Sequence, residues 1–217
     1  MSILEAKLRM EIARVAHQIA QNGLSRSSDG NISVRLSDNR ILITPAGAYK
    51  AWIEPHQIVQ IDLDGNLCSH RSSRKPSSEY LMHLAVYRHR QDVKAVIHAH
   101  PPQAVALTLI GQPFPDDLVP EGLIALGEVP TVPYARPGTA QMGEQLVPYL
   151  AGHDALLLDH HGSLTVGKTL EEALIKLERL EAIAQLWMLA QKVGEIIPLP
   201  QAERACLKGI KSSGTER

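Results

Sequence analysis

At 217 residues, 44% of them hydrophobic and 21% charged, the chain can bury a core of its own and fits neither a disordered nor an integral membrane protein. Its 22 basic and 23 acidic residues give a formal charge of −1, so no overall field favours nucleic acid or anionic lipid as a partner. Histidine is the unusual residue type: there are ten, and imidazole titrates near neutrality and is the commonest metal ligand.

The first third of the chain predicts a helix followed by short strands. Over residues 4–19, apolar side chains recur at three- and four-residue spacing, and Gly23 suits the cap that ends such a helix. Residues 32–36 and 40–44 are strand-like and are joined by polar turn residues, so we expect a hairpin. Residues 58–63 alternate before the next polar turn, which predicts a further strand pair.

The rest of the chain predicts four more helices and two buried strands. Pro76-Ser77-Ser78-Glu79 begins a helix, with a serine as its cap and the glutamate in its first turn. Residues 93–100 are a buried strand that two prolines end, and residues 103–110 predict a short helix. Residues 155–159 predict a second buried strand. A long amphipathic helix is expected over 170–193, followed by a short helix and a polar end.

This order of elements predicts one α/β domain, residues 1–217, around a mostly antiparallel sheet, with 200–217 as a loosely ordered end. The irregular alternation of strands and helices, without a Gly-rich loop after a strand, gives no support to NAD or ATP. Cys68 and Cys206 lie far apart without a pairing pattern, which indicates a reducing compartment. Because we find no secretory signal and no apolar run long enough for a membrane span, we expect a cytoplasmic protein.

His98-Ala99-His100 is the strongest local signal for chemistry. Two residues apart on a strand, both imidazoles point to the same side, where the strand ends. His160-His161 ends the second buried strand, and one of the two can reach the same layer. Three imidazoles with an open position are typical of a catalytic zinc, and ordinary strand histidines are the alternative. His83 shares a helix face with Glu79 and is expected to pack or bond within the helix.

Glu79 is the candidate carboxylate, although a glutamate in a first helical turn is also explained by the helix dipole. The hydroxyls of Ser77 and Ser78, with the free amides of the helix start, form a natural cradle for an anion such as phosphate. Simple capping is the alternative, and the two roles are compatible. The turns at Gly30-Asn31 and Thr44-Pro45-Ala46-Gly47 can add backbone donors to this cradle.

Five motifs in this order resemble the class II aldolase/adducin family, with the best likeness to its L-fuculose-1-phosphate aldolase branch: Gly30-Asn31-Ile32-Ser33, Thr44-Pro45-Ala46-Gly47, Lys75-Pro76-Ser77-Ser78-Glu79, His98-Ala99-His100-Pro101 and His160-His161-Gly162. The resemblance covers about residues 5–195. It implies αβα layers, a divalent metal (usually zinc, with manganese or cobalt as alternatives) and a homotetramer with active sites at subunit interfaces.

The resemblance also implies a role for each matched residue. The implied metal ligands are His98, His100 and His161, together with Glu79. Glu79 is also the implied catalytic acid or base. The implied substrate-phosphate ligands are Asn31, Gly47, Ser77 and Ser78. The reaction would be retro-aldol cleavage of L-fuculose 1-phosphate, or of a 5-deoxy- or methylthio-pentulose 1-phosphate, to dihydroxyacetone phosphate and an aldehyde.

Two positions depart from the fuculose aldolase pattern. Ala46 replaces a phosphate-binding threonine, and Val119 replaces the tyrosine at the aldehyde end. Glu121 is the candidate acid or base there, across a subunit interface, with a surface carboxylate as the alternative. The same end can also be lined by Tyr134 and Arg136. An epimerase, dehydratase or decarboxylase of the same fold is the first alternative function. The family's epimerases carry an aspartate at the position of Glu79, which counts against that activity. A non-catalytic adducin-like scaffold is the second alternative.

Overall fold

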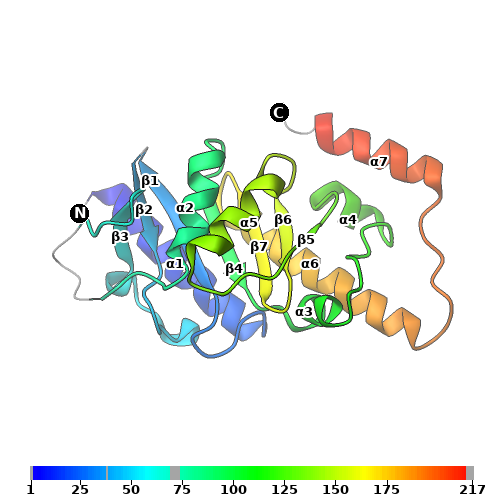
Figure 1. Ribbon diagram of the computed structural model, residues 1–217, viewed down its shortest axis with the longest axis horizontal. Helices are drawn as coiled ribbons and strands as arrows, with labels where there is room; N and C mark the ends of the chain where they lie inside the picture. Colours follow the sequence, from blue (N-terminus) through cyan, green and yellow to red (C-terminus); the bar gives the residue numbers. More distant parts are fainter. Residues whose placement is uncertain (1, 38, 69–73, 214–217) are drawn as a thin grey trace.

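One sheet organises the chain in this computed structural model, which describes residues 2–37, 39–68 and 74–213 (Figure 1). Its strands are β1 (Asn31–Ser37), β2 (Arg40–Ile43), β3 (Val59–Asp62), β4 (Ala95–Ala99), β5 (Thr131–Val132), β6 (Ala155–Leu158) and β7 (Gly162–Gly167). Their order across the sheet is β3-β2-β1-β4-β7-β6-β5. Every neighbouring pair is antiparallel except β5 and β6. The expected α/β fold around a mostly antiparallel sheet is therefore confirmed.

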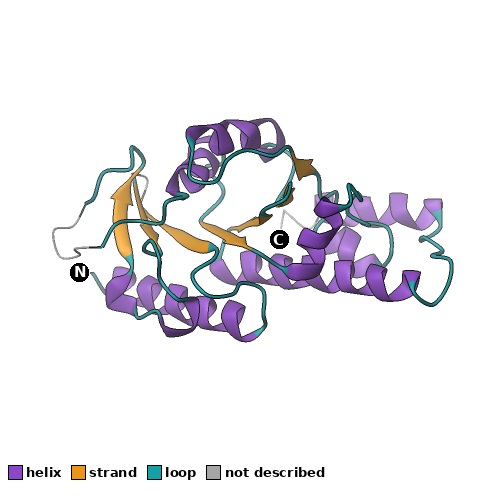
Figure 2. Cartoon of the chain, turned by 60° about the horizontal axis from the view of Figure 1, so that its bottom comes forward, coloured by secondary structure: helices purple, strands orange, loops and turns teal. Residues whose placement is uncertain are grey.

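Helices cover both faces of this sheet (Figure 2). They are α1 (Ile3–Gln21), α2 (Tyr80–His89), α3 (Pro102–Leu109), α4 (Pro120–Ala125), α5 (Ala140–Leu150), α6 (Leu170–Gln191) and α7 (Gln201–Ser213), with two 3-10 turns, η1 (Lys50–Trp52) and η2 (Pro55–Gln57). One buried apolar cluster joins α1 and α6 to the sheet, and another joins α2 and α5 to the opposite face. A third cluster lies under α3, α4 and the second half of α6.

The central strand β4 shows how this layering directs side chains. Ala95, Ile97 and Ala99 are buried in the cluster with α1 and α6, and Val96 is buried in the cluster with α2 and α5. Because successive side chains on a strand point to opposite faces, His98 points to the same side as Val96. Its imidazole therefore belongs to the α2 side of the sheet.

Most of the predicted elements are present, with two differences. The face of α1 is buried as predicted at Ile12 and Ile19, but Leu4 is 55% exposed. The strand pair expected around the turn after β3 is present only in part among the described residues: an isolated antiparallel bridge joins Ile61 and Leu67, and the Cys68 amide donates to the Gln60 carbonyl at 3.0 Å. The Asp62 carboxylate accepts bonds from the backbone amides of Asp64 and Asn66, so a side chain stabilises the turn between them.

The far end of the molecule from β3 carries α4 and α7 (Figure 1). The two helices pack together, and Arg204 of α7 donates to Asp117 at 2.9 Å. Within the described ranges, no helix combines the length and apolar character needed to cross a membrane. Cys68 and Cys206 are both free thiols.

Candidate active site

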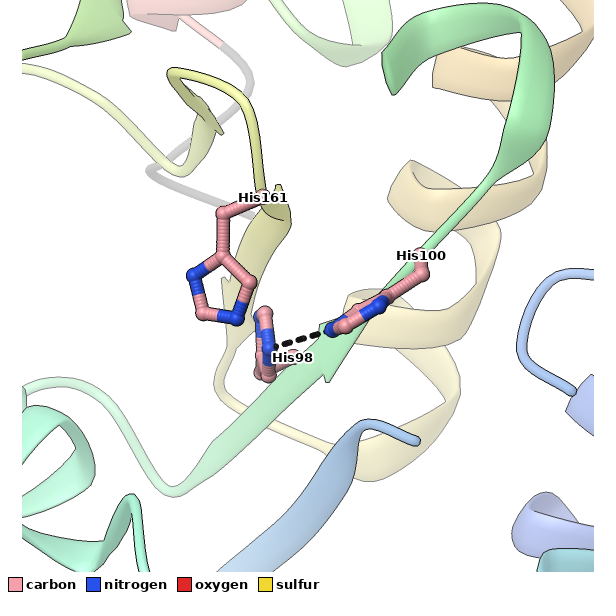
Figure 3. Close-up of side chains that lie close together, drawn as sticks. All are labelled: His98, His100 and His161. Atoms are coloured by element: carbon pink, nitrogen blue, oxygen red, sulfur yellow. Dashed lines mark hydrogen bonds between the residues drawn. The ribbon is translucent and has the colours of Figure 1, made fainter. Parts of the chain in front are cut away.

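Three imidazoles converge at the ends of two strands (Figure 3). His98 lies on β4, His100 follows that strand, and His161 precedes β7. One potential ligand nitrogen from each lies within 4.8 Å of the others. The Nε2 atoms of His98 and His100 are 2.9 Å apart, and His98 uses Nδ1 to bond the carbonyl of Ser163 at 2.9 Å. That bond leaves Nε2 of His98 facing the cluster, and metal-binding histidines commonly use their other ring nitrogen to bond a backbone carbonyl in this way.

The turn between β6 and β7 separates the two adjacent histidines. His160 adopts a left-handed backbone conformation, with φ of 53°, and its ring bonds Asp159 on the exposed side. His161 instead points into the cluster. Gly162 permits this approach, because a Cβ built there would lie 2.5 Å from the Ala99 carbonyl oxygen and 2.9 Å from a carbon of the His98 ring.

Burial disfavours the charged form of two of these imidazoles. Burial lowers the pKa of His98 to about 3, although the nearby Glu79 charge opposes the shift. Burial also lowers the pKa of His100, and the charge of His161 adds to that effect. Neutral imidazole is the form that binds metals. The Nε2 atoms of His98 and His100, 2.9 Å apart, need a proton or a cation between their lone pairs.

Glu79 completes the donor set. The sequence placed Glu79 in the first turn of a helix, but it is the N-cap residue of α2, and its side chain makes no capping bond. The Ser77 hydroxyl accepts a hydrogen bond from the Glu79 amide. The two carboxylate oxygens lie 3.5 Å from Nε2 of His98 and 3.2 Å from Nε2 of His161. Burial raises the pKa of Glu79, but the contacts with His161 and His98 outweigh it and leave the pKa well below its usual range.

These donors fit a divalent metal ion. Glu79 Oε1 and His161 Nδ1 are buried side-chain atoms for which the described residues provide no well-directed hydrogen bond. Buried polar atoms without partners are uncommon, and a bound ligand or a partner chain is one explanation for them. Three imidazoles and a carboxylate are a donor set that suits zinc, manganese or cobalt.

The cluster opens into a cavity of about 500 Å³ on the α2 side of the sheet. Its walls bring together all the predicted anion ligands and most of the predicted metal ligands: Asn31, Gly47, Ser77, Ser78, Glu79, His100 and His161. Asn31 pairs directly with His98 across β1 and β4, which places both side chains on one face. Gly30 makes this approach possible, because a Cβ there would meet the His98 carbonyl at 2.6 Å and its φ is 72°.

The cavity also holds residues that the sequence did not single out. Asp29 and Gly138 line it. Behind the loops lies Lys50, 2% exposed, whose ammonium donates to the carbonyls of Ser28 and Ala48 at 3.0 Å each. Burial lowers the pKa of Lys50 to about 8, and the charges of Asp29 and Glu79 oppose the shift. Lysine is rarely fully buried, so no local sequence pattern marks Lys50 as buried.

The residues predicted for the aldehyde end are not part of this cavity wall. Val119 is the N-cap of α4, and Glu121 is an exposed residue in the first turn of that helix. Tyr134 is 57% exposed. The role of Glu121 across a subunit interface stays a prediction.

The layered sheet and its strand-end histidines define a class II aldolase fold. Residues 10–188 match the model of the Class II Aldolase and Adducin N-terminal domain, and the chain belongs to this family.

Three known proteins illustrate the range of activities to which the chain is similar. It is 35% identical to a 3-oxo-tetronate 4-phosphate decarboxylase of Escherichia coli K12, over 84% of this chain and 87% of that protein. It is 34% identical to a 5-methylthioribulose-1-phosphate/5-deoxyribulose-1-phosphate aldolase of Rhodospirillum rubrum, over 95% of this chain and 92% of that protein. The structure of an L-fuculose 1-phosphate aldolase superposes with a TM-score of 0.85, at 30% identity over 94% of this chain and 95% of that one.

Proposed function

We propose that this protein is a divalent-metal-dependent carbon–carbon lyase that acts on a small phosphorylated hydroxyketone and releases dihydroxyacetone phosphate. One observation carries the proposal: the metal-type donors and the anion-type donors line the same cavity of about 500 Å³. That volume suits a small ligand with a phosphate at one end and a chelating hydroxyketone at the other.

In this proposal the metal ligands are His98, His100, His161 and Glu79. The bound ion, zinc or else manganese or cobalt, would supply Lewis-acid stabilisation of the negative charge that develops on the hydroxyketone oxygens. Glu79 moves the proton at the carbon that loses its bond partner. Its low pKa keeps it ionised, which suits it to remove that proton in the condensation direction; its protonated form returns the proton in the cleavage direction.

The phosphate would be held without a basic surface. Ser77 and Ser78 offer hydroxyls beside the start of α2, and Gly47 and Asn31 close the cavity on the loop side. Amides at a helix start carry partial positive charge and point toward such an anion. This agrees with a chain whose net charge is −1.

Two leaving groups are compatible with this arrangement, because both give the same three-carbon fragment. In a ketose 1-phosphate the C3–C4 bond breaks, C3 keeps the electron pair, and the C4 hydroxyl loses its proton as the aldehyde departs. In a 3-oxo-tetronate 4-phosphate the C1–C2 bond breaks, C2 keeps the pair, and carbon dioxide departs. Protonation of the carbon that keeps the pair gives dihydroxyacetone phosphate in both cases.

The residues of one chain favour decarboxylation. An aldehyde leaving group needs a base at its hydroxyl, and Glu121, the predicted one, lies outside the cavity wall of the described chain. Carbon dioxide needs no such base. The similarity to the decarboxylase of Escherichia coli supports this assignment.

Retro-aldol cleavage is the second candidate, supported by a Rhodospirillum rubrum relative that matches 95% of this chain. It requires a partner subunit to bring Glu121 to the cavity, as in a cytoplasmic homotetramer with interfacial sites. For this reaction Glu121→Gln should lower turnover at least about tenfold. Unchanged turnover on a cleaved ketose 1-phosphate would remove Glu121 from the mechanism, and light scattering of the purified protein tests the tetramer.

A substrate panel tests the proposal. The purified protein, loaded with zinc, is assayed for dihydroxyacetone phosphate release from 3-oxo-tetronate 4-phosphate, 5-deoxyribulose 1-phosphate, methylthioribulose 1-phosphate and L-fuculose 1-phosphate. We expect release from the first substrate to be fastest. Release from none of the four by a protein that retains metal would contradict a lyase and favour a dehydratase or an epimerase. A protein that binds no metal would favour the adducin-like scaffold.

A further inference from the structure

A row of buried polar side chains runs away from Glu79 between β1 and α2. Asn31 donates from Nδ2 to Glu79 Oε2 at 2.8 Å, and the Asn31 carbonyl oxygen contacts Nε2 of His83. On the other side of that ring, Nδ1 of His83 lies 2.6 Å from the Ser33 hydroxyl, which lies 2.9 Å from the Tyr87 hydroxyl. Asn31 is 2% exposed, and the three residues beyond it are fully buried.

The fold explains why these four residues meet. Asn31 and Ser33 are two apart on β1, so their side chains share the face covered by α2. His83 and Tyr87 are four apart on α2, so they form one stripe of that helix toward the strand. Strand and helix periodicity thus bring two pairs of polar groups into one continuous row.

The charge of Glu79 fixes the direction of every bond in this row. An ionised carboxylate can only accept hydrogen bonds, so Asn31 must turn its NH₂ group toward it. The Asn31 carbonyl then needs a donor, which only a protonated Nε2 of His83 can provide. Burial lowers the pKa of His83 to about 4, so the ring is neutral and its Nδ1 carries no proton. That nitrogen accepts from Ser33, whose oxygen accepts from Tyr87.

The opposite direction is unfavourable in the same geometry. It would turn the Asn31 carbonyl oxygen toward the Glu79 carboxylate at a separation of 2.8 Å, without water between the two acceptors. Bonds that all point one way also polarise one another in a buried row, so each donor strengthens the next. The last donor in the row is the Asn31 amide, and it points at Glu79.

The far end of the row is held by Arg35. Its guanidinium lies over the Tyr87 ring, 4.7 Å from the centroid, and donates to the Tyr87 carbonyl at 2.6 Å. Arg35 is itself buried on β1. These contacts fix the position from which the Tyr87 hydroxyl reaches Ser33.

We propose that His83, Ser33 and Tyr87 are positioning residues that lock the Asn31 amide with its NH₂ group toward Glu79 and the cavity. The proposal rests on the function proposed above, in which Glu79 transfers a proton and Asn31 contacts the substrate. The three positioning residues do not line the cavity, so they act through Asn31. A flipped Asn31 would present a carbonyl oxygen to both a carboxylate and an anionic substrate, and the lock prevents this.

The protonation of the His83 ring tests the lock directly. Nitrogen NMR of the zinc-loaded protein distinguishes the two neutral forms of each imidazole, and the spectrum of His83→Gln identifies the signals of His83. We expect a neutral ring between pH 6 and 8, because burial lowers its pKa to about 4, with the proton on Nε2, where it faces the Asn31 carbonyl oxygen. A proton on Nδ1, or a doubly protonated ring, would overturn the proposal. This readout does not depend on turnover, so it remains decisive if the protein proves not to be a lyase.

Kinetics of three variants test the consequence. His83→Leu keeps the volume but removes the donor to Asn31, and should lower kcat/KM about 10- to 100-fold, as expected when a charged group loses an oriented donor. His83→Gln can donate to Asn31 and accept from Ser33, and should recover most of that loss. Tyr87→Phe removes the most distant donor and should cost less than His83→Leu. All three should retain one equivalent of zinc.

A loss of the same size in His83→Leu and His83→Gln, with zinc retained, would show that His83 is merely a packing residue and would overturn the lock. Wild-type activity in His83→Leu would overturn it as well. If a variant fails to fold, the affinity of zinc-loaded wild-type protein for inorganic phosphate, compared with that of Tyr87→Phe, provides the same test. The lock predicts weaker phosphate binding in the variant, and equal affinity contradicts it.

Discussion

The imidazole cluster and the anion cradle share one cavity, but different parts of the chain build them. His98, His100 and His161 project from strand ends, and strand register and a close glycine contact fix their positions. The cradle consists of turns and a helix start, in which Gly30 and Gly47 have positive φ. The first region therefore depends on particular side chains, whereas the second depends on backbone conformation.

This difference predicts how each region responds to substitution. Removal of one imidazole should destroy the cluster, because no other described side chain can replace the lost donor. Removal of one hydroxyl should only weaken the cradle, because neighbouring amides remain. Substitutions in the two regions test this contrast.

The adjacent histidines give a matched pair for the largest effect. His161→Ala should abolish both bound metal and turnover, because it removes a donor from the cluster. His160→Ala should leave both within about twofold of wild type, since that ring is exposed, bonds Asp159 and is not part of the cluster. Metal analysis and the lyase assay measure the outcome. An active, metal-free His161→Ala protein would refute the proposed mechanism.

Gly162→Ala tests whether the close approach of the β6–β7 turn positions the cluster. The added Cβ would lie 2.5 Å from the Ala99 carbonyl oxygen, so the turn must shift and carry His161 with it. We expect zinc affinity to fall about 10- to 100-fold, as misplacement of a ligand by about 1 Å would produce. Gly152→Ala is the control, because a Cβ there meets nothing within 4 Å. Equal affinities for the two variants would contradict the packing argument.

Buried neutral histidine should make the α2 side of the sheet sensitive to acid. His83 has its ordinary pKa of 6.5 lowered to about 4, so the unfolded chain binds a proton that the folded chain does not. Its contribution to stability is complete above pH 6.5 and is lost as the pH falls toward 4, by about 3 kcal/mol in total. Urea unfolding of metal-stripped protein between pH 7 and 5 should show a steeper loss for wild type than for His83→Gln. Parallel curves would contradict a neutral His83.

The smallest effect is expected at the cradle. Ser78 is exposed, so Ser78→Ala removes a hydroxyl without a packing cost. We expect KM for the phosphorylated substrate to rise about three- to tenfold with kcat unchanged. A rise of this size corresponds to the loss of one hydrogen bond to a charged group. A loss of activity as complete as that of His161→Ala would show that the two regions do not differ as described.

The imidazole cluster could be predicted from the sequence more fully than the turns and loops around it. His98-Ala99-His100 has the two-residue spacing that a strand directs to one side, so its geometry followed from periodicity alone. Which member of His160-His161 joins them depends on a left-handed turn that periodicity does not encode. Lys50 was missed because its burial arises from loops that meet in space, and β7 was missed because Gly162-Ser163 gives it a weak strand pattern.

Cobalt titration of the metal-stripped protein is the sharpest test of the metal site, because the visible spectrum of cobalt reports both stoichiometry and coordination by imidazole and carboxylate. We expect saturation at one equivalent per chain, with an open four- or five-coordinate spectrum that is lost in His98→Ala and kept in His160→Ala. No saturable binding to wild type, or an unchanged spectrum in His98→Ala, would contradict a metal site formed by His98, His100, His161 and Glu79.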